Sequence, residues 1–71
     1  MMDILDRLQE EECEVVLMLS CGKEITGRAH SIVWEEDENG LDTVKALLFK
    51  PRGAALYDVF FEDDIRSYRK A

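Results

Sequence analysis

The sequence is short of cysteine, histidine, proline and long apolar runs, and each shortage excludes a class of protein. Two cysteines without a C-x-x-C pair are too few for a disulfide scaffold or a cysteine-based zinc site, so a reduced, cytoplasmic setting is expected. No apolar run approaches the roughly 20 residues that span a membrane. The opening segment MMDILDRLQEEE has neither a cationic stretch nor a long apolar core, so it is not predicted to be a secretory signal.

Basic residues are also scarce. Sixteen acidic residues stand against nine basic ones, which gives a net charge of −7. The acids cluster at Glu10–Glu14, Glu35–Glu38 and Glu62–Asp64. Because affinity for nucleic acid comes mostly from Lys and Arg contacts to phosphate, the average surface disfavours nucleic acid. It favours basic or neutral partners instead.

Residues that could support catalysis are few. His30 is the only histidine, and the sequence marks no partner that would orient it as a base for Cys21 or for a serine. A lone histidine is therefore interpreted as structural. No glycine-rich phosphate loop occurs, and no pair of carboxylates can be assigned to acid–base work. We expect no enzyme activity, no small-molecule substrate and no cofactor.

One segment partly matches a calcium loop. Glu35, Asp37, Asn39 and Gly40 occupy the first, third, fifth and sixth positions of such a loop, but the twelfth, which should be a bidentate glutamate, is Ala46. No helix is expected on either side. An acidic, solvated hairpin is therefore preferred over a calcium site, and no metal is predicted.

The hydrophobic pattern predicts a mainly β fold, in which a short N-terminal helix precedes a five-stranded SH3-like or Sm-like small barrel within one domain, 1–71. Asp3 can cap the helix, and Ile4, Leu5 and Leu8 form one apolar stripe. So short a helix must pack on the domain or on a partner. Five bent strands with short connections suit a barrel, because closure limits exposed edges. The expected ranges are helix 3–11 and strands 14–20, 24–35, 43–49, 55–61 and 65–69.

Glycine and proline mark the expected bends and turns. The apolar positions of strand 24–35 do not keep a clean period of two, and Gly27 is expected to form a bend or bulge there. Asn39 and Gly40 predict a type I′ hairpin, which needs positive φ at both residues. Pro51 and Gly53 end the strand at 43–49.

Apolar residues occupy both faces of the strand at 14–20: Val15, Leu17 and Leu19 on one, Val16 and Met18 on the other. Both faces should therefore be covered, one by the core and the other by the N-terminal helix. Cys13 and Cys21 bracket this strand and are expected to be buried as small hydrophobes. Eight extended residues hold them too far apart for a disulfide.

The aromatic residues predict a contact surface. Phe60 and Phe61 are adjacent in one strand, so they point to opposite faces and cannot both enter one core. One of the pair, with Tyr57 or Trp34, is expected to be exposed. We predict a non-catalytic protein-interaction domain that binds a protein partner or self-associates through a sheet face or edge, with acids steering a basic partner. The expected contact residues are Trp34, Tyr57, Phe60, Tyr68, Glu35, Glu36 and Asp37.

The segment LSCGKEITG resembles the first Sm motif, L-x-x-G-x-x-h-x-G, through Leu19, Gly22, Ile25 and Gly27. The helix-first order and the closing VFFEDDIRSY also resemble Sm-like proteins, including the bacterial RNA chaperone of that superfamily. They look equally like YolD-like proteins, which are small bacterial barrel domains. As a pattern, the resemblance covers 14–68. It implies a small barrel and, for the Sm-like family, an RNA site built from a ring of subunits.

The sequence departs from the Sm pattern in its functional positions. Val33 stands where an aspartate is expected, and the acidic hairpin EEDENGLD replaces the nucleotide loop. Arg52-Gly53 imitates the second motif but lies one turn too early. We therefore expect the fold of the Sm-like family but assign none of its RNA-binding residues to this sequence. A nucleic-acid-associated protein is the alternative function, with expected contacts at Lys45, Lys50, Arg52, Arg66, Arg69 and Lys70.

Overall fold

The computed structural model describes residues 3–37 and 39–71, so Met1, Met2 and Glu38, the last acid of one predicted cluster, lie outside the described residues. The elements are α1 (Ile4–Glu10), β1 (Val15–Leu19), β2 (Glu24–Glu36), β3 (Thr43–Pro51), β4 (Asp58–Phe61), the 3₁₀ helix η1 (Glu62–Asp64) and β5 (Ile65–Lys70). The predicted mainly β class, the one short N-terminal helix and the five strands are confirmed. No helix among the described residues is long and apolar enough to cross a membrane.

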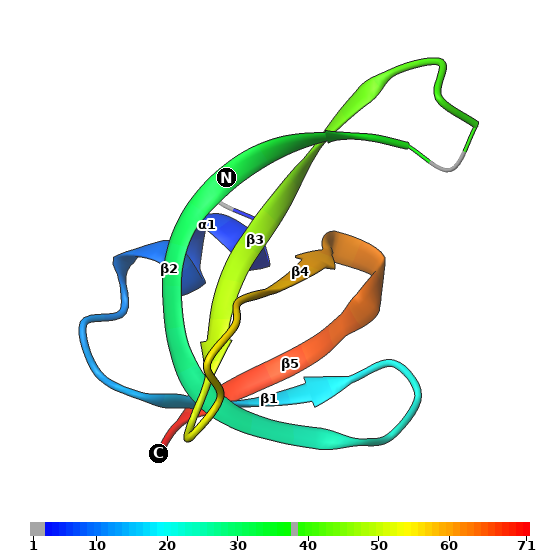
Figure 1. Cartoon of the computed structure of the whole chain (residues 1–71). Coiled ribbons are helices and arrows are strands. Elements are labelled where there is room, and N and C mark those ends of the chain that lie inside the picture. The colour runs from blue at the N-terminus through cyan, green and yellow to red at the C-terminus, as the bar shows by residue number, and fades with distance from the viewer. Residues whose placement is uncertain (1–2, 38) are drawn as a thin grey trace.

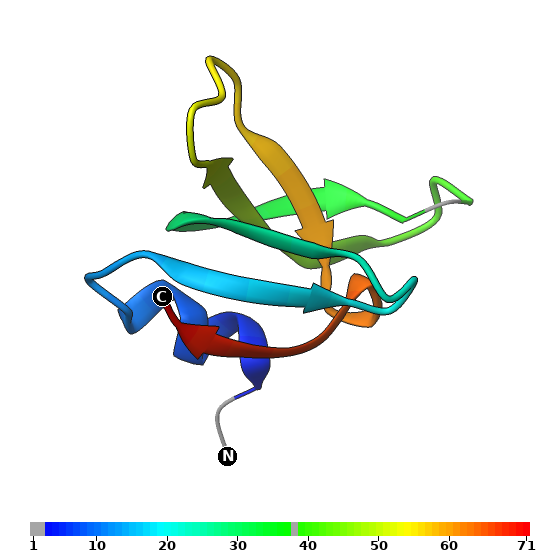
Figure 2. The same ribbon diagram turned by 90° about the horizontal axis from the view of Figure 1, so that it is seen from below.

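The strands form one antiparallel sheet in the order β4-β3-β2-β1-β5. The sheet is strongly curved, and the β2–β3 hairpin projects beyond the other strands (Figures 1 and 2). Within the described residues no ladder joins the edge strands β4 and β5, so the sheet is not closed. The two ends approach through η1, where Ser20 N donates to Asp64 O at 2.9 Å and Ser20 Oγ donates to Asp63 O at 2.6 Å.

The helix packs on the core of the sheet. The Asp3 side chain accepts a hydrogen bond from Asp6 N at 2.9 Å, which confirms the predicted cap. Leu5 and Leu8 are fully buried in the same cluster as residues of β1, β2, β3 and β5. The expectation that the helix covers a second, separate face of β1 is therefore wrong. Val16 and Met18, on that other face, are only half-buried. The buried cluster is Leu5, Leu8, Val15, Leu17, Ala29, Leu47, Phe49 and Ile65.

Strand β2 contains the predicted bulge, but at a different residue. The register between β2 and β3 shifts between Ala29 and Ser31, which leaves His30 as the extra residue. Gly27 has another role: a Cβ built on it would lie 2.2 Å from the carbonyl oxygen of Lys50 on β3. Gly27 is thus required because β3 approaches its backbone closely.

The β2–β3 turn differs from the predicted type I′ hairpin. Gly40 has a φ of 69°, but no non-glycine residue in the described chain has positive φ, so Asn39 does not meet the requirement. The turn is wider and is closed by a hydrogen bond from Asp37 N to Asp42 O at 2.9 Å. The Asp37 carboxylate accepts from Asn39 N and Leu41 N, both at 3.1 Å. A local side chain, rather than a left-handed residue pair, therefore shapes this turn.

Strand β4 begins three residues later than predicted. Its ladder with β3 runs from Ala46↔Phe61 to Phe49↔Asp58 and then stops. The following residues of β3 lead to Pro51, which has no N–H to donate. The segment 55–57, expected to be strand, is instead part of the connection, and Leu56 within it is strongly exposed.

Both cysteines are exposed and free, so the prediction that Cys13 and Cys21 are buried is wrong. Each lies just outside β1, in the segments that enter and leave the strand, and not in the strand itself. The alternation that buries Val15 and Leu17 does not extend to the chain beyond the strand ends.

Candidate interaction surface

The two faces of β3 have different neighbours. Leu47 and Phe49 are fully buried in the core, and Lys45 on the same face reaches α1. Because side chains alternate along a strand, the residues between them point to the opposite side. Residues directly opposite in an antiparallel ladder share a face, so the register extends this second side to β2 and β4. We call it the outer face: Arg28, Ser31, Val33 and Glu35 of β2, Val44, Ala46, Leu48 and Lys50 of β3, and Val59 and Phe61 of β4.

The centre of the outer face is apolar. Val59 is 40% exposed, Val33, Leu48 and Phe61 are half-buried, and the small Ala46 between them is fully buried. The helix packs on the core side of the sheet, and among the described residues no further layer lies over the outer face (Figure 2). An uncovered apolar surface of this kind is typical of a contact site.

One end of the outer face is basic and aromatic. Arg28 and Lys50 are directly opposite in the ladder, and both are exposed. The Lys50 ammonium lies 5.8 Å from the ring centroid of Tyr57, within the range of a cation–π contact. The ring of His30, the bulge residue, meets Tyr57 edge-on at a centroid distance of 5.1 Å. We call these four residues the basic end.

The other end of the outer face is acidic. Glu35 is exposed beside Val44, at the base of the projecting hairpin. Next to them, at the edge of the face, is a hollow of about 510 Å³ that is lined by Val44 and Phe61 of the outer face, by Lys45 of the inner face and by Glu62 and Asp63 of η1. We call Glu35, Glu62 and Asp63 the acidic end. The outer face thus carries opposite charges on either side of an apolar centre.

Most of the predicted nucleic-acid contacts are held in ion pairs. Lys45 contacts Asp3 and Asp6, Arg52 contacts Glu14, Arg69 contacts Glu24, and Lys70 lies 3.9 Å from Glu11. Arg66 donates to the backbone oxygen of Ser20 at 3.2 Å. Lys50 has no carboxylate partner within the described residues, and the structure does not gather these six side chains into one patch.

The predicted aromatic contacts divide into two groups. Trp34 is 66% exposed and Tyr57 is 44% exposed, but they lie on different faces, since Trp34 is opposite Lys45. Phe60 is half-buried and packs edge-on against Phe49 at 5.9 Å. Tyr68 is also half-buried against the core. Of the two adjacent phenylalanines, Phe60 therefore joins the core and Phe61 belongs to the outer face.

The polar contacts of Tyr68 indicate that it stabilises the fold. Its hydroxyl donates to Glu11 at 3.4 Å. Burial, followed by the negative charge of Glu11, raises the pKa of Tyr68 above its ordinary value of 10.0.

Of the predicted acidic contacts, Glu35 and Glu36 are exposed, whereas Asp37 is half-buried and holds the hairpin turn. Glu36 lies opposite Thr43, on the face shared with Trp34. The structure therefore does not bring the seven predicted contact residues together on one surface.

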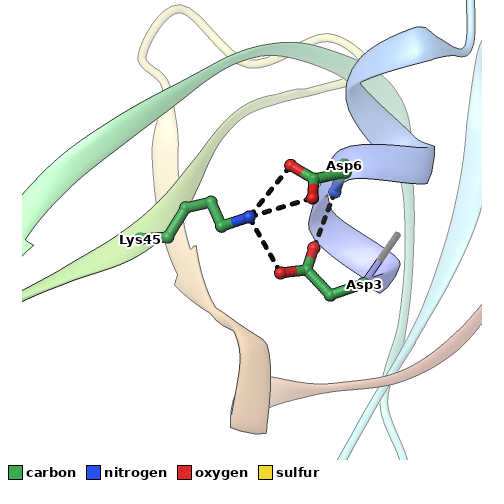
Figure 3. Close-up of polar contacts among 3 residues, drawn as sticks. All are labelled: Asp3, Asp6 and Lys45. Carbon is green, nitrogen blue, oxygen red and sulfur yellow. Dashed lines mark hydrogen bonds and ion pairs between the residues drawn. The ribbon is translucent and has the colours of Figure 1, made fainter. Parts of the chain in front are cut away.

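A lysine clamp fixes α1 against β3 (Figure 3). Lys45 Nζ lies 2.9 Å from Asp3 Oδ2 and 2.9 Å from Asp6 Oδ2. The hydrogen bond from Lys45 lowers the pKa of Asp3, with a further contribution from the backbone of Asp6. The hydrogen bonds that Lys45 donates to Asp3 and Asp6 raise the pKa of Lys45. The clamp explains why a two-turn helix keeps a fixed position on the sheet.

The side chains that could take part in catalysis or metal binding have structural roles in this fold. His30 Nδ1 lies 3.0 Å from Ser31 Oγ, and both are near the bulge. The candidate calcium residue Asp37 uses its carboxylate on backbone N–H groups, and Ala46 is buried in β3. Within residues 3–37 and 39–71, no group of three or more His, Cys, Asp or Glu side chains is placed to hold a metal ion.

Sequence reasoning missed Arg28, His30, Leu48 and Val59 as parts of a surface. For Arg28 and His30 the signal was the break in the period of two along 24–35, which correctly indicated a bulge but was assigned to Gly27. A bulge at His30 places Arg28 and Val33 on one side despite their odd spacing.

No protein-family model, curated protein or solved structure matches this chain. The resemblance to Sm-like and YolD-like proteins therefore stays a prediction from the motif residues.

Proposed function

We propose that this chain is a non-catalytic, cytoplasmic protein-interaction domain that binds its partner through the outer face of β2, β3 and β4. The observation that carries the proposal is the apolar centre of this face, where Val59 is exposed beside half-buried Val33, Leu48 and Phe61, with an exposed Tyr57 at its basic end. We further propose that the curved sheet is a small SH3-like barrel, with η1 bringing its two ends together.

The arrangement of charge supports specific recognition of a partner rather than non-specific hydrophobic association. The apolar centre lies between Arg28 and Lys50 on one side and Glu35 on the other. Complementary charge around an apolar centre sets the orientation of a partner and disfavours wrong ones. A small domain that used this face only for solubility would be expected to have polar residues there.

A capture experiment tests the proposed function. The tagged wild-type chain and a Val59→Asp/Tyr57→Ser variant are used to capture proteins from the source lysate. Loss of a specific partner in the variant is expected, since an acid in the apolar centre opposes desolvation. A matched variant, Glu10→Lys/Glu12→Lys, changes exposed residues near α1 and should keep the partner. Equal capture by all three folded proteins would reject the outer face as the binding surface.

One observation favours the alternative of a nucleic-acid-associated protein. Lys50 and Arg28 lie beside an exposed tyrosine, and cations beside an aromatic ring suit a single strand. A salt-dependent affinity for single-stranded RNA that is lost in Lys50→Glu and kept in Lys23→Glu would support it. No binding at low salt would exclude it.

A further inference from the structure

We infer that the partner of the outer face is a second copy of the same chain, bound through a two-fold axis across the apolar centre. This inference rests on the proposed function, because it uses the same face. Its motivation is the order of chemistry along that face: Arg28 and Lys50 of the basic end and Glu35 of the acidic end lie on β2 and β3 on either side of the apolar centre, and Glu62 and Asp63 follow directly after β4 in η1.

A face with this order is complementary to itself when turned round. A two-fold axis makes each surface contact the same surface of the other copy in the opposite direction. The basic end of one copy then meets the acidic end of the other, and the reciprocal contact forms at the same time. Both apolar centres lie between these contacts, so Val59 and Leu48 of each copy are covered.

The two ends cannot satisfy each other within one molecule. Val44 and Lys50 mark the acidic and basic ends of β3, and both belong to one continuous ladder with β2. Six residues of antiparallel strand separate them by about 20 Å. Arg28 and Lys50 have no ion-pair partner within the described residues, whereas four other basic side chains do. The hydrogen bond from Arg52 lowers the pKa of Glu14, and the charge of Arg28 contributes to this shift. The Lys50 ammonium instead contacts the Tyr57 ring, so the charge of Lys50 is the part of the basic end that is most available to another molecule.

Two opposing factors set the expected strength of the dimer. The net charge of −7 repels two copies, but salt screens this repulsion beyond about 8 Å at physiological ionic strength. The reciprocal charge contacts act at shorter range. A stable interface needs about 800 Å² from each partner, and the chain exposes 4947 Å² in total. One face of three strands is of the right order, so we expect a concentration-dependent dimer.

The test is a charge-reversal exchange followed by analytical ultracentrifugation. One variant, Arg28→Glu/Lys50→Glu, makes both ends acidic. The other, Glu35→Lys/Glu62→Lys, makes both ends basic. All four residues are exposed, so both variants are expected to fold, which circular dichroism verifies. Controls with the same charge change elsewhere are Arg7→Glu/Lys23→Glu and Glu10→Lys/Glu12→Lys.

The expected results are specific. Wild type and both controls dimerise, each reversed variant alone dimerises at least about tenfold more weakly, and an equimolar mixture of the reversed variants forms a heterodimer. The heterodimer is the decisive result, since only facing ends of opposite charge restore it. A folded pair that does not associate when mixed would overturn the inference, and so would a wild-type chain that is monomeric at every concentration.

The same measurements separate this inference from the proposed function. If the wild type is monomeric but the Val59→Asp/Tyr57→Ser variant still loses a captured partner, the inferred dimer is wrong, and the outer face remains a surface that binds another protein. If the wild type dimerises and the charge controls weaken it as much as the reversals, another face makes the dimer and the inference fails, while the capture experiment still decides the proposed function.

Discussion

The two faces of β3 are both apolar, yet only one of them is a core. Leu47 and Phe49 on the inner face are fully buried by α1 and the curved sheet, while Leu48 on the outer face stays half-buried beside an exposed Val59. Residue type alone does not distinguish these positions. The difference comes from what packs over each face, so the inner face should determine stability and the outer face should determine association.

The largest expected effect is on the inner face. Phe49→Ala removes a fully buried ring that packs against Phe60, and it should lower the free energy of unfolding by about 3–5 kcal/mol. Urea unfolding followed by circular dichroism measures the change. A loss below about 1 kcal/mol, the size of an ordinary point mutation, would show that this face is not the core.

A smaller loss of stability is expected from a substitution at Gly27, where β3 approaches β2 closely. Gly27→Ala places a Cβ 2.2 Å from the Lys50 carbonyl oxygen and 2.7 Å from the Pro51 Cα, so the backbones must separate. We expect a loss of about 1–3 kcal/mol, as for other overpacked sites. Thr26→Ala, one residue away on the same strand, is the control in thermal unfolding. Equal stability of the two variants would mean that the strands are not in this close contact.

The lysine clamp should make part of the stability depend on pH. The pKa of Asp3 is lowered from 3.8, so its contribution is present above that value and is lost as pH falls through the lowered pKa. The pKa of Lys45 is raised from 10.5, so its contribution is present below that value and is lost as pH rises through the raised pKa. Lys45→Gln should therefore reduce stability most between these limits.

Melting temperatures across this pH range check the clamp. The melting temperature of the wild type should decrease at both the acidic and the alkaline limit of this range. The melting temperature of the Lys45→Gln variant should depend less on pH. Lys23→Gln removes an exposed lysine that has no ion pair in the described chain and should leave the profile unchanged. Parallel profiles for the wild type and Lys45→Gln would contradict a role for the clamp in stability.

The smallest effect on stability is expected on the outer face. Val59→Thr keeps the side-chain shape at a position that is 40% exposed, so stability should change by no more than about 0.5 kcal/mol. Val15→Thr makes the same change at a fully buried position and should cost about 1–3 kcal/mol, because the hydroxyl loses water. Similar losses at both positions, measured by urea unfolding, would remove the distinction between the two faces.

Local sequence signals predicted the elements better than they predicted the surfaces. The helix cap at Asp3 and the presence of a bulge in β2 have short-range causes, and both were expected from neighbouring residues. The exposure of Cys13 and the burial of Phe60 depend on which segments approach them in three dimensions. Phase along β2 was the other obstacle, since moving the bulge from Gly27 to His30 exchanges the faces of the residues between them, Arg28 and Ala29.

The candidate site was predicted only in part, for the same reason. Tyr57 and Glu35 were expected from their chemistry, but Arg28 and Lys50 become neighbours only through the register of β2 and β3. Trp34, chosen for its type, is exposed on the other face. Side-chain chemistry identified plausible contacts, and the ladder decided which of them share a surface.

The bulge at His30 also bears on how this chain tolerates insertions and deletions. One residue here changes the alternation of β2, so that Ala29 before it and Ile32 after it both face the core. Removing His30 would leave a continuous ladder in which Ala29, Ser31 and Ile32 keep their present partners on β3, so every later side chain of β2 would keep its face. The loss would be local, and it would consist of the edge-on contact of the His30 ring with Tyr57 and the extra twist of the bulge. A one-residue deletion at this position should therefore be tolerated better than a deletion in a regular part of the strand.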